Sequence, residues 1–343
     1  MKKSSWFVPI FILVGFHLSA QDYLFTQYDR VMLLLNPSSA GSFDGFERFS
    51  LQNRNQWVGA GTRFMTSLAA AELTFGKNNF DNKSYAGMGI HVTRDVGGDA
   101  RFGSNQFGAS LSGHLVTSKQ SKFSAGIQMA ASNRSGDLSN LLFFSQWNGS
   151  VFDPSIPTNE PNQIARFSYV DAGAGLSYTY SSKGNRVSQV RQRYVNIGVF
   201  AQHIARPKLR YNEITYDRLY VKFGGHLETE VNMGNRLTLE LKTIQLLQGK
   251  HYQGRYGILF KTVMKQGASI TRLKNDAFFS SGLYINSTGT LSPVCLLNLG
   301  RVQIGLNYDL ELSKMSRAYR SSIECSFSYT FTQSSLFKGI KIG

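Results

Sequence analysis

The segment RVQIGLNYDLELSKMSRAYRSSIECSFSYTF, residues 301–331, alternates apolar and polar side chains along both of its ends. In residues 301–312 every second side chain is apolar, from Val302 to Leu312, and most of those between are polar or charged. The end of the segment repeats this pattern, with apolar side chains set between serines, Glu324 and Thr330. A period of two is that of a β-strand with one apolar and one polar face. The segment therefore predicts two long strands.

The same alternation recurs along the chain and predicts about fourteen strands. They are expected at residues 45–57, 64–76, 84–95, 105–117, 121–133, 166–182, 191–203, 218–231, 235–247, 253–264, 275–286, 290–299, 301–312 and 318–332. Most exceed ten residues, which is longer than the usual soluble strand and long enough to cross a bilayer at a tilt. The twelfth strand is the least regular, because it alternates poorly and contains Pro293.

The lengths of the connections favour a membrane barrel. Even-ranked connections such as 118–120 and 232–234 are short, and the odd-ranked connections 134–165 and 204–217 are long. Bacterial outer-membrane barrels have short periplasmic turns and long outer loops. The rule fails near residues 265–274 and is weak at 286–288, so we allow for one misplaced hairpin. We expect an all-β protein: a transmembrane, antiparallel, up-and-down β-barrel.

The composition agrees with this fold class. The chain has 42% hydrophobic residues, 13% aromatic residues, 33 glycines and a mean hydropathy of −0.20. After the first twenty residues, nothing approaches the eighteen or so consecutive apolar residues that a spanning helix needs, which excludes a helical membrane protein. A barrel tolerates this polar average because only alternate residues face lipid.

Three regions are expected along the chain. Residues 1–20 have a basic start, an apolar core and an end at Ala20, the layout of a secretory signal peptide. Residues 21–44 form an N-terminal segment, with the apolar run RVMLLL and a turn in NPSSAG. This segment is expected either to plug the lumen or to lie on the periplasmic rim. Residues 45–343 form the barrel.

Charge and cysteines narrow the choice of partners. The formal charge is +16, from 37 basic and 21 acidic residues. Export makes nucleic acid an improbable partner, so anionic lipopolysaccharide or an acidic protein is the better hypothesis. A disulfide between Cys295 and Cys325 is allowed in an exported protein. Because the alternation places Cys325 on the lipid-facing row, we favour two unpaired cysteines.

The sequence gives little support for catalysis. His91, His114 and His226 fall on inward rows of the predicted barrel. They are not accompanied by a GxSxG or HExxH motif or by Cys/His metal spacing. Mixed inward charges such as Arg54, Lys242 and Asp309 are compatible with a selective pore or with a filled, salt-bridged interior. We expect no enzymatic activity, no metal and no cofactor.

Two outer connections are candidate partner-binding loops. The seventh connection combines basic and aromatic side chains, which are favoured in protein interfaces, although a solvated loop is an equal alternative. The fifth is rich in aromatic residues and is expected to fold over the mouth or to present a binding surface. The candidate residues are Phe143, Phe144, Trp147 and Phe152 in the fifth connection and Arg206, Lys208, Arg210 and Tyr211 in the seventh.

Three N-terminal motifs resemble the PorP/SprF family of the Bacteroidetes type IX secretion system. They are FTQY at 25–28, NPSSAG at 36–41 and RNQWVG at 54–59. The similarity extends to VNIGVFAQHIARP at 195–207 and to residues 302–331, and thus covers nearly the whole mature chain. The family's usual NPAYAG reads NPSSAG here, which weakens any inference about the cargo. The matched residues are Phe25, Gln27, Tyr28, Asn36, Pro37, Gly41, Arg54, Gln56 and Trp57.

The resemblance implies an outer-membrane barrel that acts in protein secretion. Family members are associated with the export or surface retention of proteins bearing a C-terminal signal domain, often large adhesins used in gliding. It also implies contact with outer-membrane lipid and with other secretion-system components, including outer-membrane lipoproteins. We expect Asn36, Gly41 and Arg54, with their neighbours in the motifs, to shape the N-terminal segment against the barrel. Trp57 alternatively serves as an interfacial aromatic. The competing hypothesis is a channel or transporter for small solutes.

Overall fold

The computed structural model describes residues 23–58, 64–77, 83–136, 141–158, 166–183, 191–210, 217–234, 236–265, 277–312 and 321–332. The predicted signal peptide, residues 1–20, lies outside these ranges. In the described part of the chain, no helix has the length and apolar character needed to cross a membrane.

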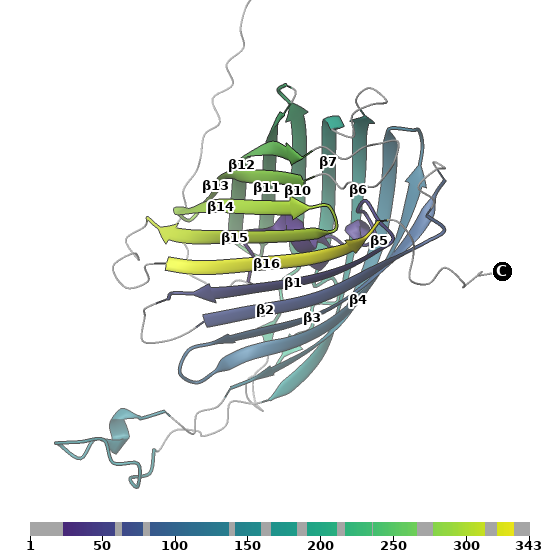
Figure 1. Cartoon of the computed structure of the whole chain (residues 1–343). Helices are drawn as coiled ribbons and strands as arrows, with labels where there is room; N and C mark the ends of the chain where they lie inside the picture. The colour runs from purple at the N-terminus through teal and green to yellow at the C-terminus, as the bar shows by residue number, and fades with distance from the viewer. Residues whose placement is uncertain are drawn as a thin grey trace, which may run out of the picture.

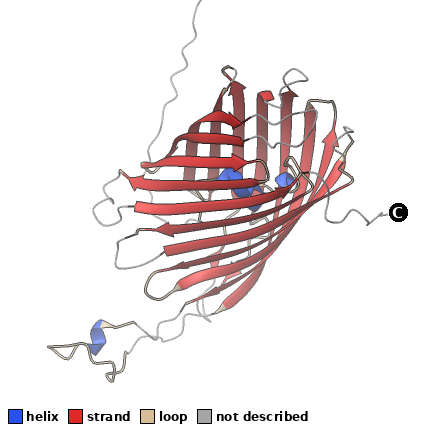
Figure 2. Cartoon of the chain, in the orientation of Figure 1, coloured by secondary structure: helices blue, strands red, loops and turns tan. Residues whose placement is uncertain are grey.

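Fourteen antiparallel strands close into one barrel (Figures 1 and 2). Each strand pairs with its neighbours in the chain, and β1 pairs with β16 to close the cylinder. The barrel strands are β1 (Glu47–Gln56), β2 (Phe64–Phe75), β3 (Tyr85–Gly97), β4 (Phe102–Val116), β5 (Ser121–Ser135), β6 (Phe167–Lys183), β7 (Arg191–Gln202), β10 (Lys222–Asn232), β11 (Leu237–Gln248), β12 (His251–Lys265), β13 (Ala277–Asn286), β14 (Thr290–Leu299), β15 (Val302–Glu311) and β16 (Ser321–Phe331). The predicted fold class and strand number are confirmed.

A few short elements lie outside the wall. The N-terminal segment forms two 3-10 helices, η1 (Tyr28–Leu34) and η2 (Pro37–Ser39). The connection after β5 contains η3 (Phe144–Gln146), and the connection after β7 contains a small ribbon of β8 (Lys208–Leu209) and β9 (Asp217–Arg218).

The wall has an apolar outer face and a polar inner face. In β16, Glu324 is fully buried, whereas Phe327, three residues further on and on the opposite face, is 42% exposed. Cys295 and Cys325 are free and exposed, as predicted. Leu306 pairs with both of them, so a whole strand separates the two cysteines. The alternation therefore reports the side of the wall on which each residue lies.

The allowance for a misplaced hairpin was wrong, because every barrel strand follows chain order. The irregular segment 290–299 is β14. Pro293 pairs with Leu283 on one side, but on the other side the pairing with β15 is interrupted between Leu291 and Val294. A proline lacks the N–H that a strand interior donates, so it is tolerated where the pairing is already broken.

The described part of the N-terminal segment lies inside the barrel (Figure 1). One side of the segment packs on inward-facing apolar residues of the wall: Leu24, Tyr28, Met32 and Leu35 meet Phe200, Ile244, Leu246, Leu259, Tyr284, Val294 and Leu296. A second cluster joins Phe25, Val31, Leu33, Leu34 and Ala40 to Leu68 and Ala70 of β2. The RVMLLL run is thus accommodated by apolar patches in an otherwise polar lumen. The segment was expected either in the lumen or on the periplasmic rim, and these contacts are with the lumen.

Candidate functional site

The first contact region joins the N-terminal segment to the strands that close the barrel. Glu324 of β16 accepts hydrogen bonds from two successive backbone amides, those of Thr26 at 2.7 Å and Gln27 at 2.8 Å. It also accepts one from the side chain of Gln52 on β1 at 2.8 Å. Hydrogen bonds to a carboxylate are stronger than those between neutral groups. One buried side chain therefore fixes the segment and links the first strand to the last.

Gln27 uses its whole side chain in this region. Its amide donates to Asn307 at 2.7 Å, and its side-chain oxygen accepts from the hydroxyl of Ser326 at 2.6 Å. The wall makes room for it at Gly305, where a Cβ atom would lie 2.0 Å from that oxygen. Gln27 is consequently held by β15 and β16 together, and it is fully buried.

Arg54 of β1 connects the segment to β15. Its guanidinium donates to the backbone carbonyl of Leu24 and to the carboxylate of Asp309, the latter at 3.0 Å. The same carboxylate accepts from the hydroxyl of Thr26 at 3.1 Å. Arg54 therefore contacts the backbone of the N-terminal segment directly, and it shares the carboxylate of Asp309 with Thr26.

The second contact region holds the NPSSAG turn against β2–β6. Asn36 caps the turn: its side-chain oxygen accepts from the Ser38 amide at 3.0 Å, and Pro37 occupies the first helical position. The carbonyl of Ala40 accepts from the hydroxyl of Ser112 at 2.6 Å and lies 2.8 Å from Nε2 of His114. The motif thus specifies a capped turn, and the carbonyl of Ala40 at its end contacts the barrel wall.

Gly41 ends this turn in a conformation that favours glycine. Its φ is +73°, in the left-handed region that side chains with a Cβ rarely adopt. Its amide donates to the carboxylate of Glu72 at 3.0 Å, and Glu72 also pairs with Arg48 at 2.5 Å. The segment leaves the lumen here and enters β1.

Inward-facing glycines of the wall accept the turn. A Cβ atom at Gly87 would lie 2.2 Å from the Ala40 carbonyl, and one at Gly126 would lie 2.4 Å from the Pro37 carbonyl. At Gly175 it would lie 2.0 Å from the side-chain oxygen of Asn36. These glycines are not among the residues predicted for the site. The signal was present, because they stand on polar rows where serine or threonine is otherwise common.

His114 takes part in holding the segment. Its Nδ1 lies 2.7 Å from the hydroxyl of Ser124, and its Nε2 faces Ser112 as well as the Ala40 carbonyl. Both ring nitrogens are therefore engaged in a buried network between the wall and the segment. His91 and His226 are also buried on the inner face.

An ion-pair cluster lies under η1. Asp29 pairs with Lys242 of β11 at 2.8 Å and with its neighbour Arg30 at 3.2 Å, and the hydroxyl of Tyr284 lies 3.3 Å from it. Burial alone would raise the pKa of Asp29, but the charges of Lys242 and Arg30 outweigh it and lower that pKa well below its ordinary value. Burial raises the pKa of Tyr28.

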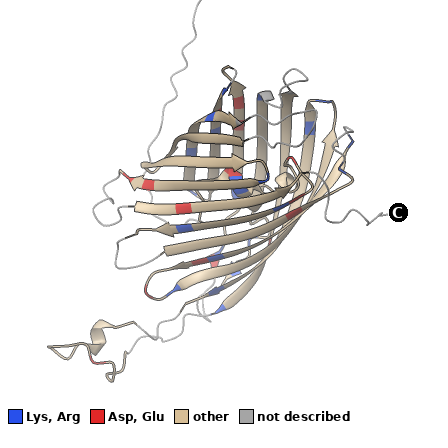
Figure 3. Ribbon diagram, viewed as in Figure 1, with Lys and Arg blue, Asp and Glu red and all other residues tan. Residues whose placement is uncertain are grey.

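Along the wall, basic and acidic residues are intermixed (Figure 3).

The remaining motif residues lie at the outer end of β1 or in the buried apolar clusters. Phe25 and Tyr28 are 3% and 2% exposed. Gln56 is half-buried, and Trp57 packs edge-on against Phe64 of β2 at 4.4 Å between ring centroids. Trp57 has a φ of +57° and marks the turn after β1.

The candidate loop residues divide between two outer connections. In residues 141–158, Gln146 donates to the carbonyl of Ile156 at 3.1 Å, and a β-bridge joins Trp147 to Phe152. Phe144 is 86% exposed, and Figure 1 shows this unit apart from the barrel wall rather than across the mouth. The fifth connection is therefore a compact, aromatic-rich unit.

The seventh connection is partly ordered by the β8–β9 ribbon. Lys208 pairs in register with Arg218, and Leu209 beside it is buried. Arg206 has a φ of +46° and Arg210 is exposed. Tyr211 lies outside the described residues.

A closed antiparallel barrel with an apolar exterior, a polar interior and long loops at one end is an outer-membrane β-barrel protein. A solved structure supports the fold: the Pseudomonas putida toluene transporter TodX has 10% identity and a TM-score of 0.50, with 88% of this chain and 93% of that chain covered. The Ralstonia pickettii toluene transporter TbuX has 11% identity and a TM-score of 0.48, covering 88% of this chain and 94% of that chain.

The chain belongs to the PorP/SprF family of type IX secretion system membrane proteins, whose family profile matches residues 17–329. The family match confirms the resemblance, and together with the closed barrel it confirms the outer-membrane location. No curated protein matches the sequence.

Proposed function

We propose that this protein is a non-enzymatic barrel of the type IX secretion system that binds a secreted surface protein and helps to export or retain it. The observation that carries the proposal is the occupied lumen: residues 24–41 are almost entirely buried inside the barrel and hydrogen-bonded to several strands. A barrel filled by its own chain acts through its surfaces rather than through a bore. We therefore assign partner binding to the outer loops.

The aromatic unit at 141–158 has the composition of an interface. Phe144, Trp147 and Phe152 are 86%, 41% and 42% exposed, and the rings of the last two are in contact at 5.0 Å between centroids. Aromatic and arginine side chains are enriched in the cores of protein interfaces. Burying these rings against a partner would remove a large apolar area from water.

Basic residues of the seventh connection form a second candidate binding surface. Arg206, Lys208 and Arg210 are exposed, and positive charge steers association with acidic surfaces. We assign the cargo's C-terminal signal domain as the bound element, with other secretion-system components, including outer-membrane lipoproteins, as further partners. Binding of this kind makes and breaks no covalent bond.

A pull-down from outer membranes in mild detergent tests the proposal. We expect the wild-type chain to retain a large secreted surface protein and the double variant Phe144→Ser, Trp147→Ser to retain much less. Ser150→Ala, an exposed change in the same loop, is the control and should retain as much as wild type. Equal retention by the double variant contradicts the assignment of this loop.

Planar-bilayer conductance measured on the same preparations separates the alternative. A wild-type protein that conducts ions and retains no partner supports an outer-membrane channel for small solutes and overturns the proposal. A protein that retains a partner and does not conduct ions supports the proposed role in secretion.

A further inference from the structure

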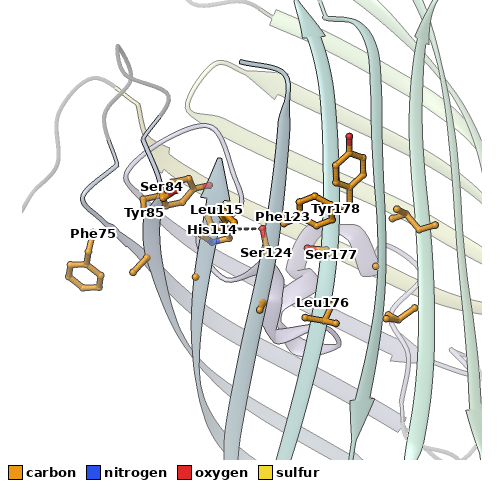
Figure 4. A pocket seen from close by; sticks show the side chains of 16 residues that line it. Phe75, Ser84, Tyr85, His114, Leu115, Phe123, Ser124, Leu176, Ser177 and Tyr178 are labelled. Carbon is orange, nitrogen blue, oxygen red and sulfur yellow. Dashed lines mark hydrogen bonds between the residues drawn. The ribbon is translucent and has the colours of Figure 1, made fainter. Parts of the chain in front are cut away.

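The outer face of the barrel has an apolar groove across β3–β7, at the end where β1 begins and β16 ends. The groove has a volume of about 940 Å³ and an almost entirely apolar surface (Figure 4). Cavities that bind small molecules typically measure roughly 300–1,000 Å³. The groove lies on the membrane side, because the side chains that line it include Leu115, Phe123 and Leu176, which are 59%, 53% and 58% exposed.

Small residues on adjacent strands create the groove. Ala86 of β3 pairs with Gly113 of β4, and Gly113 pairs with Ala125 of β5, so the three form one row across the wall. A Cβ atom at Gly113 would meet nothing within 4 Å. The row is bordered by larger side chains, with Leu176 in register beside Ala125. The outer surface is therefore recessed along this row, and the larger side chains beside it project toward the membrane.

The polar boundary of the groove is at the periplasmic end of the same strands. The hydroxyl of Tyr178 on β6 lies 3.1 Å from that of Ser121, the first residue of β5. Beyond them, Lys119 is exposed in the turn between β4 and β5. Arg193 is exposed on β7, four residues before Ile197 on the same outward row. Apolar lining thus gives way to positive charge at the membrane boundary.

We propose that this groove binds one anionic phospholipid of the inner leaflet of the outer membrane. An acyl chain lies along the Ala86–Gly113–Ala125 row, where it contacts protein on its floor and sides. The phosphate headgroup lies near Lys119 and Arg193. This inference goes beyond the proposed secretion role and stands independently of it.

The charge pattern is the reason for choosing an anionic lipid. The acyl chain of a zwitterionic lipid would fill the apolar groove equally well, but its headgroup would gain little net attraction from Lys119 and Arg193. Positive residues close to a membrane surface attract anionic lipids, each with a modest energy. The groove supplies retention and the basic residues supply selection among lipids.

Native mass spectrometry of the full-length protein tests the groove. The protein is delipidated, returned to detergent micelles with phosphatidylglycerol and sprayed intact. We expect wild type to retain one phosphatidylglycerol and Gly113→Leu, which fills open space, to retain about tenfold less, the equivalent of losing contact with about two methylene groups. Ala131→Leu is the matched control, because Ala131 is on the outward face of β5, like Ala125, but outside the groove. This variant should retain as much phosphatidylglycerol as wild type.

Selection by charge is tested with a second variant. Lys119→Gln combined with Arg193→Gln should retain phosphatidylglycerol and phosphatidylethanolamine equally, whereas wild type prefers the anionic lipid. Full retention by Gly113→Leu overturns the groove, and equal retention of both lipids by wild type overturns the anionic assignment. A co-purifying protein that is lost only from Gly113→Leu assigns the groove to a protein partner and also overturns the proposal. Unchanged heat-modifiable migration on gels verifies that each variant is folded.

Discussion

Glu324→Gln is the most direct perturbation of the contact between the N-terminal segment and the closing strands. The wild-type carboxylate has only acceptors, and it faces three donors: the amides of Thr26 and Gln27 and the side chain of Gln52. A glutamine keeps one acceptor oxygen and replaces the other with an NH₂ group. One or more of the three donors therefore loses its acceptor in a buried site and faces another donor.

The expected cost follows from the burial. Glu324 is fully buried, as is Gln27, so water cannot replace the lost partner. Hydrogen bonds to charged groups contribute about 1.5–3 kcal/mol each, and a buried donor without an acceptor costs about 1–3 kcal/mol. We expect Glu324→Gln to lower the free energy of unfolding by about 3 kcal/mol.

Guanidinium unfolding of the barrel in lipid vesicles, combined with hydrogen exchange of the segment's amides, measures this effect. We expect earlier unfolding and faster exchange at Thr26 and Gln27 than in wild type. Glu311→Gln is the matched control: its carboxylate accepts from Thr290 within the wall, so its loss should cost less than about 1 kcal/mol. If Glu324→Gln unfolds like wild type and both amides exchange as slowly as before, the two-strand linkage is refuted.

Three further predictions concern the segment's fit, its charge and the outer wall. Gly175→Ala should destabilise the barrel by about 1–3 kcal/mol, because its Cβ would collide with the capping asparagine, whereas Gly113→Ala enters open space and should be neutral in the same unfolding assay. Because folding lowers the pKa of Asp29, its stabilisation is complete above its unfolded pKa of about 3.9 and declines as the pH falls below it. Asp29→Asn should remove that part of the acid dependence, measured as unfolding free energy between pH 3 and 7. Cys295 and Cys325 should both react with a membrane-permeant maleimide without prior reduction, and blocked labelling would contradict their free state.

The barrel could be predicted from sequence because one physical constraint acts on every wall residue. A residue faces either lipid or the lumen, and its neighbour faces the other, so the period of two persists along each strand. Even β14 fits, since the interrupted pairing at Pro293 leaves the rest of the strand with the same two faces. The connection lengths predicted the alternation of short and long connections. The short outer turn after β13 breaks that rule, but it does not mark a misplaced hairpin, because the barrel strands follow chain order.

The position of the N-terminal segment could not be predicted in the same way. Its partners are single side chains on strands far apart in the sequence, such as Glu72, His114 and Glu324. A period of two places these residues on the inner face but gives no information on what they contact. Glycines on inward rows were the available clue, because a site without a Cβ marks a close approach of another backbone.

The chemistry of the contacts explains why the segment can be fixed so firmly by so few motif residues. Much of the binding is to its backbone: Arg54 contacts one carbonyl, Gln202 another at 2.6 Å, and Glu324 two amides. Backbone groups in a lumen need such partners because an unpaired buried amide or carbonyl is costly. Glu324 belongs to β16, almost 300 residues from Thr26, so these bonds form only when β16 has reached its place beside β1. Filling the lumen and closing the barrel are therefore energetically linked, and a change that releases the segment also weakens the β1–β16 seam.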